Sequence, residues 1–159
     1  MRLIKFTFIS AVLLFAVVTA ISLIIPSHIR LSKVINIPSQ RDSIFSLLKN
    51  KDQWPRWHPS FMDSANKEML SQINIRLLSE TDSTLQLQWM QKNKKPLNMS
   101  WQLFADSNST FATLQWSMDF YQKWYPWEKL GSMFYESNYG AMMEKGLLNI
   151  KAVIEKNQP

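Results

Sequence analysis

The chain has 159 residues, a formal net charge of +6 and no cysteine. It is long enough for one domain and an appendage, and it excludes disulfides and thiolate chemistry. Fifteen of the 18 basic residues and all 12 acidic residues follow position 31, so this part carries only +3, which argues against a nucleic-acid partner.

The first predicted element is a helix without a charged residue from Phe6 to Ile25. At about 1.5 Å rise per residue it spans roughly 30 Å, the hydrocarbon thickness of a bilayer. A cleaved signal peptide is the alternative, because Val18-Thr-Ala20 resembles a cleavage site. The apolar run continues beyond Ala20 to Ile25, which favours an uncleaved anchor.

This helix predicts a single-pass protein of the cytoplasmic membrane. Residues 1–31 form the tail, the transmembrane helix and a connector, and residues 32–159 form one domain. Basic residues both precede and follow the helix, so the positive-inside rule discriminates little between the two orientations. We predict that the N-terminus is cytoplasmic and the domain extracytoplasmic.

After the connector, the β-branched segment SKVINIP predicts a strand that ends at Pro38. A helix should follow from Ser39 to about Asn50, since Ile44, Leu47 and Leu48 share one face. Within the segment DQWPRWHPSF, a short second helix or turn then carries Trp54 to His58, beside the two prolines.

From Ile73 onwards the apolar period changes from 3.6 to 2. Four successive strands have one apolar and one polar face, as in an antiparallel sheet covered on one side. Their apolar positions are Ile73, Ile75, Leu77; Leu85, Leu87, Trp89; Leu97, Met99, Trp101, Leu103; and Ala112, Leu114, Trp116, Met118, Phe120.

The cover is predicted to be a long C-terminal helix. Met143, Leu147, Ile150 and Ile154 repeat at spacings of four, three and four, which makes one apolar stripe. The predicted class is therefore α+β, with an antiparallel sheet wrapped on this helix.

Three stretches in this order carry a resemblance to a known family: VINIPSQRDSIFSLLKN, QWPRWHPSF and MMEKGLLNIKAVIEK. Together they resemble the Bet v 1/START-like helix-grip fold of the SRPBCC superfamily, in particular its polyketide cyclase/dehydrase and lipid-transport families. Members typically have six strands after the two helices. The stretch from Met62 to Gln72 is poor in strand formers, so we expect a reduced sheet here.

The resemblance implies an apolar cavity between the sheet and the C-terminal helix. Large rings and adaptable methionines on the inward face are typical of a ligand pocket, but they can equally fill the space as a core. The predicted ligand-binding residues are Trp54, Trp57, Trp89, Met99, Trp101, Trp116, Met118, Phe120 and Gly146. Gly146, in mid-helix, indicates either room for a ligand or a close approach of helix and sheet.

Catalytic and metal-binding groups are scarce. His58 has no orienting partner nearby in sequence, so the 52–61 segment is predicted to be a packed corner or a lid rather than an active site. Asp119 is expected to be solvated on the outer face of its strand. Two histidines and three glycines supply neither a metal-ligand spacing nor a phosphate-binding loop, so we expect no metal, no cofactor and no catalytic residue.

The predicted function is a membrane-anchored, SRPBCC-like domain that binds a hydrophobic small molecule or lipid. Two alternatives stay open. One is a cyclase- or dehydratase-type enzyme. The other is a filled domain that acts as a protein-interaction module through exposed Trp124, Tyr125 and Trp127.

Overall fold

The computed structural model describes residues 2–38, 41–62, 67–92, 94–105 and 111–156. The chain divides into two compact units. One, here called the N-terminal unit, comprises Met1–Ile29 and Phe120–Tyr135; the other, the sheet unit, comprises Arg30–Asp119 and Glu136–Pro159. The predicted boundary after residue 31 lies within a strand, and Phe120–Tyr135 groups with the N-terminal residues.

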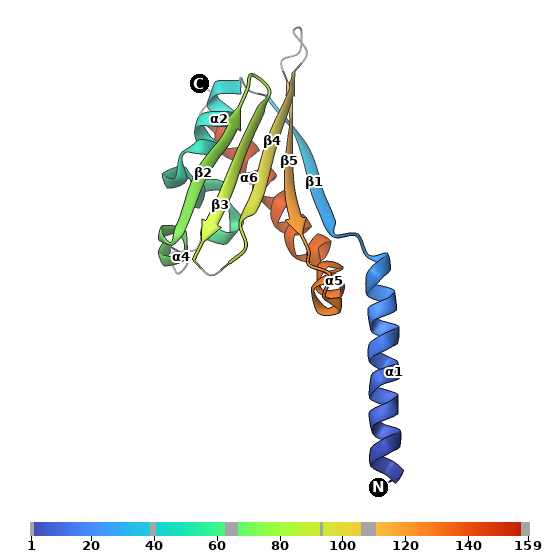
Figure 1. The fold of residues 1–159 in the computed structure, drawn as a ribbon. Helices are drawn as coiled ribbons and strands as arrows, with labels where there is room; N and C mark the ends of the chain where they lie inside the picture. The colour runs from blue at the N-terminus through green and yellow to red at the C-terminus, as the bar shows by residue number, and fades with distance from the viewer. Residues whose placement is uncertain (1, 39–40, 63–66, 93, 106–110, 157–159) are drawn as a thin grey trace. The chain divides into compact units, whose positions relative to one another are not determined.

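Five strands form one antiparallel sheet, in the order β1-β5-β4-β3-β2 (Figure 1). The strands are β1 (His28–Ile37), β2 (Ile73–Glu80), β3 (Thr84–Gln91), β4 (Leu97–Ala105) and β5 (Ala112–Tyr121). All four strands predicted from the period of two are present, and β2 to β5 form a meander of sequential antiparallel pairs.

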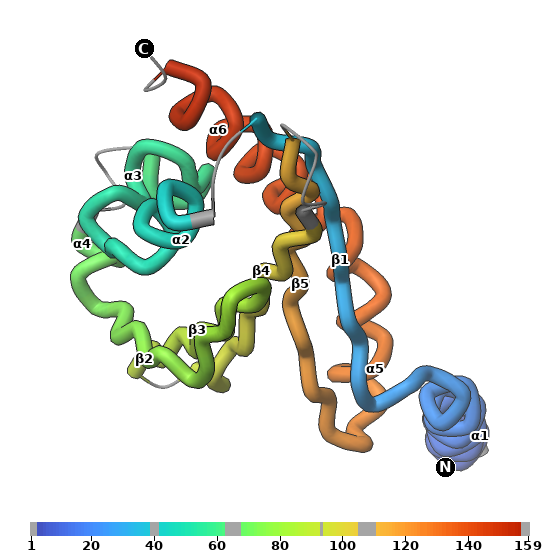
Figure 2. Tube along the Cα trace, turned by 90° about the horizontal axis from the view of Figure 1, so that it is seen from above, coloured from blue at the N-terminus to red at the C-terminus, as the bar shows by residue number. Residues whose placement is uncertain are grey.

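Along the chain, helices precede β1, separate β1 from β2, and follow β5. They are α1 (Arg2–Ile24), α2 (Arg41–Lys49), η1 (Lys51–Gln53), α3 (Trp54–Trp57), η2 (Pro59–Phe61), α4 (Lys67–Ser71), α5 (Pro126–Ser132), the π-helical turn η4 (Glu136–Gly140) and α6 (Ala141–Lys156). Figures 1 and 2 show α2, α3 and α6 on one face of the curved sheet. The predicted start of α2 at Ser39 lies outside the described residues.

The sheet register explains which side chains form the core. Met99 pairs with Met118, and Trp101 with Trp116, so large apolar side chains face one another across β4 and β5. All four are at most 1% exposed. A side chain on a strand alternates between the two faces, so this register places the intervening polar residues on the other face.

Helix α6 covers the apolar face. Its predicted stripe of Met143, Leu147, Ile150 and Ile154 is buried, as is Gly146 beside it. Asn149 of the same helix donates a hydrogen bond from Nδ2 to the carbonyl of Trp57, at 2.9 Å, and so ties α6 to α3. The predicted α+β helix-grip architecture is confirmed.

The start of β1 differs from the prediction, and the structure also describes most of the stretch before β2. Strand β1 begins at His28, inside the predicted connector, because Arg30 and Ser32 bond to side chains of β5, a contact invisible in local sequence. The described residues between Phe61 and Ile73 form only the end of η2 and the short α4, so the expected reduced sheet is confirmed for the described part of this stretch.

In the N-terminal unit, α1 contains one apolar segment, Leu3–Ile24, that is long enough to cross a membrane. Its mean hydropathy is 2.5 over the most apolar window, and 6% of that window is buried. A signal sequence has the same length and composition, so the finding is compatible with either.

The docking of α6 predicts a large difference between two adjacent leucines. Leu147 is 1% exposed and Leu148 is 60% exposed. Leu147→Asp places an unpaired carboxylate against the sheet and should cost several kcal/mol, enough to unfold a marginal domain. Leu148→Asp should leave the melting temperature, measured by circular dichroism of the full chain in detergent, nearly unchanged. Equal melting temperatures for the two variants would contradict this packing.

Candidate functional site

The 52–61 segment positions four rings in the interior. Pro55 lies in the first turn of α3 and Pro59 in that of η2, where a missing backbone N–H costs nothing. Between them His58 is extended, with φ −81° and ψ 115°, so the chain turns sharply there. This turn points Trp54, Trp57, His58 and Phe61 into the core; none is more than 1% exposed.

These rings join three tryptophans of the sheet in what we call the interior aromatic cluster. Its members are Trp54, Trp57, His58, Phe61, Trp89, Trp101 and Trp116. Ring centroids lie 4.8 Å apart for Trp54 and Trp89, and 5.7 Å apart for Trp101 and Trp116. Such pairs add about 0.5–1.5 kcal/mol each beyond the area they bury.

The cluster contains polar atoms that find no protein partner. Trp54 donates from Nε1 to the carbonyl of Leu48, at 2.9 Å. The other polar ring atoms are buried without a hydrogen bond to any described residue: Nε1 of Trp57, Trp89, Trp101 and Trp116, and Nε2 of His58. Each unpaired buried donor costs about 1–3 kcal/mol, so this concentration in one interior is unusual.

His58 lies at the centre of the cluster. Its ring is 5.1 Å from that of Trp89 and 5.7 Å from that of Trp116, between centroids. Its Nδ1 accepts a hydrogen bond from the backbone N–H of Ser60, at 3.3 Å, which assigns the proton of the neutral ring to Nε2. Burial lowers the pKa of His58 to about 3, because the charged imidazolium would lose its hydration.

The mid-helix glycine of α6 allows a close contact between this helix and the sheet. A Cβ on Gly146 would lie 2.8 Å from Cζ3 of Trp116 and 3.3 Å from Cδ of Pro59. Any larger residue would push the indole ring off the helix. In this structure the space beside Gly146 is therefore filled by Trp116.

The nine predicted ligand-binding residues do not all gather in one place. Five are members of the aromatic cluster, and a sixth, Gly146, contacts the cluster at Trp116. Met99 and Met118 form a cross-strand pair two positions along from the pair of Trp101 and Trp116. Phe120 instead contacts Tyr135, with centroids 4.6 Å apart, in the N-terminal unit.

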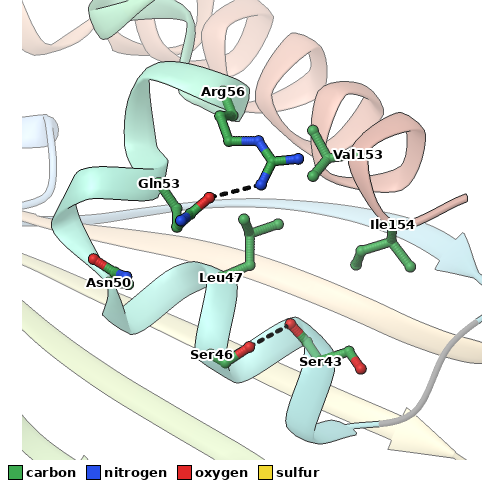
Figure 3. Close-up of a pocket in the computed structure, with 8 residues that line it drawn as sticks. All are labelled: Ser43, Ser46, Leu47, Asn50, Gln53, Arg56, Val153 and Ile154. Carbon is green, nitrogen blue, oxygen red and sulfur yellow. Dashed lines mark hydrogen bonds between the residues drawn. The ribbon is translucent and has the colours of Figure 1, made fainter. Parts of the chain in front are cut away.

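A pocket of about 380 Å³ lies elsewhere in the sheet unit, between α2, the turn that follows it and the end of α6 (Figure 3). Five of its eight lining residues are polar, and among them Arg56 donates from Nη1 to Oε1 of Gln53 at 2.7 Å. None of the nine predicted residues contributes to it. The lining residues are Ser43, Ser46, Leu47, Asn50, Gln53, Arg56, Val153 and Ile154.

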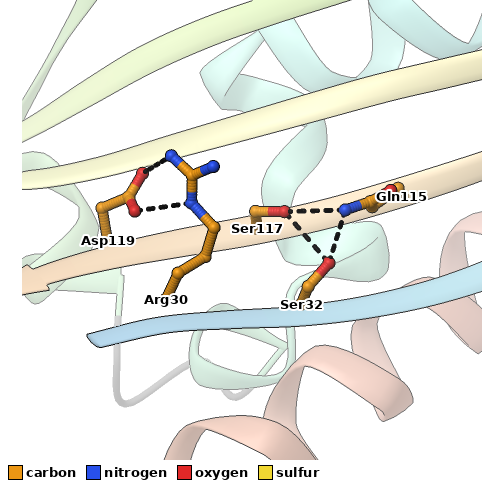
Figure 4. Close-up of polar contacts among 5 residues, drawn as sticks. All are labelled: Arg30, Ser32, Gln115, Ser117 and Asp119. Atoms are coloured by element: carbon orange, nitrogen blue, oxygen red, sulfur yellow. Dashed lines mark hydrogen bonds and ion pairs between the residues drawn. The ribbon is translucent and has the colours of Figure 1, made fainter. Parts of the chain in front are cut away.

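On the outer face of the sheet, side chains of β1 and β5 form a polar ladder (Figure 4). Arg30 donates from Nε and Nη2 to the two carboxylate oxygens of Asp119, at 2.7 and 3.0 Å. Ser32 lies within 3.1 Å of the Ser117 hydroxyl. The prediction that Asp119 is solvated is wrong: its side chain is only 11% exposed, because the guanidinium covers it.

A second set of charges joins β1 to the start of α6. Lys33 bonds Glu136 at 2.7 Å and Glu144 at 2.6 Å. The hydrogen bonds that Lys33 donates to Glu136, and then to Glu144, raise the pKa of Lys33. These partly exposed ion pairs tie β1 to η4 and to the start of α6.

Sequence patterns missed two features of the site. The unpaired donors of the cluster depend on how rings orient in three dimensions, which no spacing encodes. The pocket combines residues of α2 and α6, which lie about a hundred residues apart in sequence. The available signal was the density of tryptophan between positions 54 and 116, which indicated large buried rings but not their unpaired nitrogens.

The comparisons with known proteins agree with this geometry at the level of fold. No protein-family model matches the sequence, and no curated protein matches it. Among solved structures, the di-domain ARO/CYC protein StfQ of the steffimycin pathway superposes with a TM-score of 0.57 at 11% identity, over 81% of this chain and 51% of that one. This chain thus spans about half the length of StfQ.

Two further structures extend the same picture. The ZhuI aromatase/cyclase of Streptomyces sp. R1128 has a TM-score of 0.54 at 9% identity, over 81% of this chain and 94% of that one. CalU16 of Micromonospora echinospora has a TM-score of 0.51 at 13% identity, over 82% and 76%. This chain therefore shares the helix-grip fold with these structures, two of which are named as aromatase/cyclases.

Proposed function

We propose that this chain is a membrane-anchored helix-grip domain that binds an apolar small molecule or lipid, with oxygen atoms of the ligand accepting hydrogen bonds in the interior aromatic cluster. The observation that carries the proposal is a set of five buried ring nitrogens, Nε2 of His58 and Nε1 of four tryptophans, that form no hydrogen bond with any described residue. The similarity of the fold to aromatase/cyclases supports a hydrophobic ligand in the same interior.

The donor set defines the chemistry of that ligand. An indole can only donate, and the assigned tautomer of His58 makes its Nε2 a donor as well. The cluster therefore offers five N–H groups and no free acceptor. N–H contacts with neighbouring ring faces compensate only in part. A carbonyl, ester or hydroxyl oxygen on an otherwise apolar molecule would satisfy several of these donors at once.

Binding requires the interior to open, because Trp101 and Trp116 are fully buried. Met99 and Met118 beside them are unbranched and can adopt other rotamers at low cost. Movement of the Trp116 ring would also free the space beside Gly146, where no Cβ stands in the way. The packed state is then the resting form of an adaptable site.

An enzyme of cyclase or dehydratase type is the first alternative. Its natural base would be His58, whose ring forms one hydrogen bond, from the Ser60 backbone to Nδ1, in the described part of the chain. Nδ1 is thus already occupied, and Nε2 carries the proton. No described carboxylate orients the ring, so the arrangement favours binding over acid–base catalysis.

Membrane anchoring is supported by the apolar segment Leu3–Ile24 of α1. At about 1.5 Å per residue its 22 residues reach roughly 33 Å, enough to span a bilayer. We place the N-terminus in the cytoplasm and the domain outside it. The other alternative, a filled interaction module, would use α1 only as a tether.

The buried neutral His58 predicts a specific pH dependence. The unfolded chain binds a proton below the ordinary pKa of 6.5, whereas the folded state does so only near pH 3. The contribution of the neutral His58 to the free energy of unfolding is therefore fully present above pH 6.5 and is lost as the pH falls towards 3. Between pH 7 and pH 5 the loss should be about 2 kcal/mol.

Urea unfolding of the full chain in detergent at several pH values measures this loss. His58→Phe, or His58→Gln if that variant folds poorly, should show about 2 kcal/mol less dependence on pH over the same range. An unchanged dependence in a folded variant would mean that His58 is not the titrating group.

Ligand binding is tested with two probes of nearly equal shape, 2-acetylnaphthalene and 2-isopropenylnaphthalene, which differ in one carbonyl oxygen. The wild type should bind the ketone roughly tenfold more tightly, as one net hydrogen bond of about 1.4 kcal/mol implies. Trp116→Phe keeps a ring but removes a donor and should reduce this preference.

The matched control is Trp124→Phe, because Trp124 is 65% exposed and lies outside the cluster. It should leave the ketone preference at the wild-type value. Absence of binding of both probes to the wild type, with no lipid found by native mass spectrometry of the purified chain, would leave the interaction-module alternative.

Anchoring predicts that the full chain resists alkaline carbonate extraction of membranes at its uncleaved mass. A soluble form that begins near Ile21 would instead identify α1 as a signal sequence.

A further inference from the structure

The N-terminal unit exposes an unusual number of large apolar side chains on the segment around α5. We call this set the aromatic patch: Tyr121, Trp124, Trp127, Met133 and Phe134, each between 60% and 68% exposed. Large exposed apolar side chains that gather on one segment mark an interaction surface.

The patch is ordered by its own contacts. Trp124 packs on Tyr125, and Tyr125 stacks on Trp127 with an interplanar angle of 5°; both pairs have centroids 5.0 Å apart. Pro126 begins α5 directly after Tyr125, its N-cap residue. Lys123 Nζ lies 5.8 Å from the centroid of the Tyr125 ring. The rings are thus held in place before any partner binds.

This segment is bonded to the C-terminal end of α1, within the same compact unit. Lys129 of α5 is 5% exposed, and its Nζ donates to the carbonyl of Ile25 at 2.8 Å and to the hydroxyl of Ser27 at 2.6 Å. The backbone N–H of Gln122 donates to the carbonyl of Ser27 at 2.7 Å, and the Tyr121 ring stacks on His28. Figure 1 shows α5 next to this end of α1.

The position of this junction along α1 sets the depth of the patch. If the apolar segment Leu3–Ile24 fills the hydrocarbon layer, Ile25 lies at its boundary with the headgroups. The hydrogen bonds from Lys129 then hold α5 at that same level. Tryptophan and tyrosine favour this level, since their rings are apolar and their N–H or O–H groups reach water.

We propose that the aromatic patch inserts into the headgroup region of the bilayer that α1 spans, so that the N-terminal unit is docked on the membrane and not merely tethered to it. This inference rests on the proposed membrane anchoring. Continuity with α1 favours lipid over a protein partner, because the hydrogen bonds of Lys129 hold the segment that carries the patch at the end of the span.

The absence of cysteine from the sequence allows a direct test with single nitroxide labels. Trp127→Cys and Met133→Cys report on the patch, and both native side chains are exposed, so folding should be retained. Leu13→Cys, in the middle of α1, is the reference for the bilayer interior, and Asp82→Cys, in the exposed turn between β2 and β3, is the reference for water. Each full-length variant is reconstituted in vesicles of phosphatidylcholine and phosphatidylglycerol at a ratio of about three to one.

The measured quantity is the accessibility of each label to oxygen, which partitions into lipid, relative to a water-soluble nickel chelate. At Trp127 and Met133 the ratio should be several-fold higher than at Asp82 and lower than at Leu13. Water-like values at both patch positions, with a lipid value at Leu13, would overturn the docking and leave the anchor intact.

Two other outcomes would also contradict the inference, each in a distinguishable way. A water-like value at Leu13 would remove the anchor itself and the docking with it. Low accessibility to both reagents at the patch, with spectral broadening between labels of neighbouring molecules, would show that a second copy of the chain covers these rings in place of lipid.

Discussion

The contact between Gly146 and Trp116 is the constraint on which the interior of the sheet unit depends. A sheet with one apolar face needs a cover, and α6 approaches that face closely enough for an indole ring to lie against its backbone. The missing Cβ costs about 1 kcal/mol of helix stability, which the burial of Trp116 offsets. With Trp116 in this place, its ring contacts those of Trp57, Trp101 and His58.

A core built of indoles has a property that an aliphatic core lacks. Each ring removes a large apolar area from water, but each also brings an N–H group that water had solvated. Trp54 resolves this by bonding to the Leu48 carbonyl, since α2 ends beside it. The sheet tryptophans find no such partner among the described residues, where the strands that carry them pair with one another. The interior is therefore stabilised by the apolar area that it buries, while several of its N–H groups have no acceptor among the described residues. This combination would suit the oxygen-bearing apolar ligand proposed above.

The sequence predicts the features that leave a local repeat in the chain, and it does not predict those that depend on contacts between distant residues. The period of two identified β2 to β5, and the Met143–Ile154 stripe identified α6, because burial on one face leaves a repeat in the chain. The early start of β1 and the burial of Asp119 both follow from the ion pair between Arg30 and Asp119. These two residues lie 89 positions apart, and a contact at that separation leaves no repeat in the sequence. The donor cluster likewise depends on the sheet register and on ring rotation. The residue types of the site were thus predictable, whereas their unpaired atoms were not.

The seven tryptophans differ in exposure according to the unit that contains them. Trp54, Trp57, Trp101 and Trp116 are fully buried in the sheet unit, and Trp89 is half-buried there. The remaining two, Trp124 and Trp127, are about two-thirds exposed, and both lie in the unit that contains α1. Exposed indoles are unfavourable in water but favourable at a lipid interface, so their restriction to this one unit has a physical reason if that unit meets a bilayer. Under the two proposals made above, the same residue type has two roles in one chain: it encloses a ligand in the sheet unit and holds the N-terminal unit against the membrane.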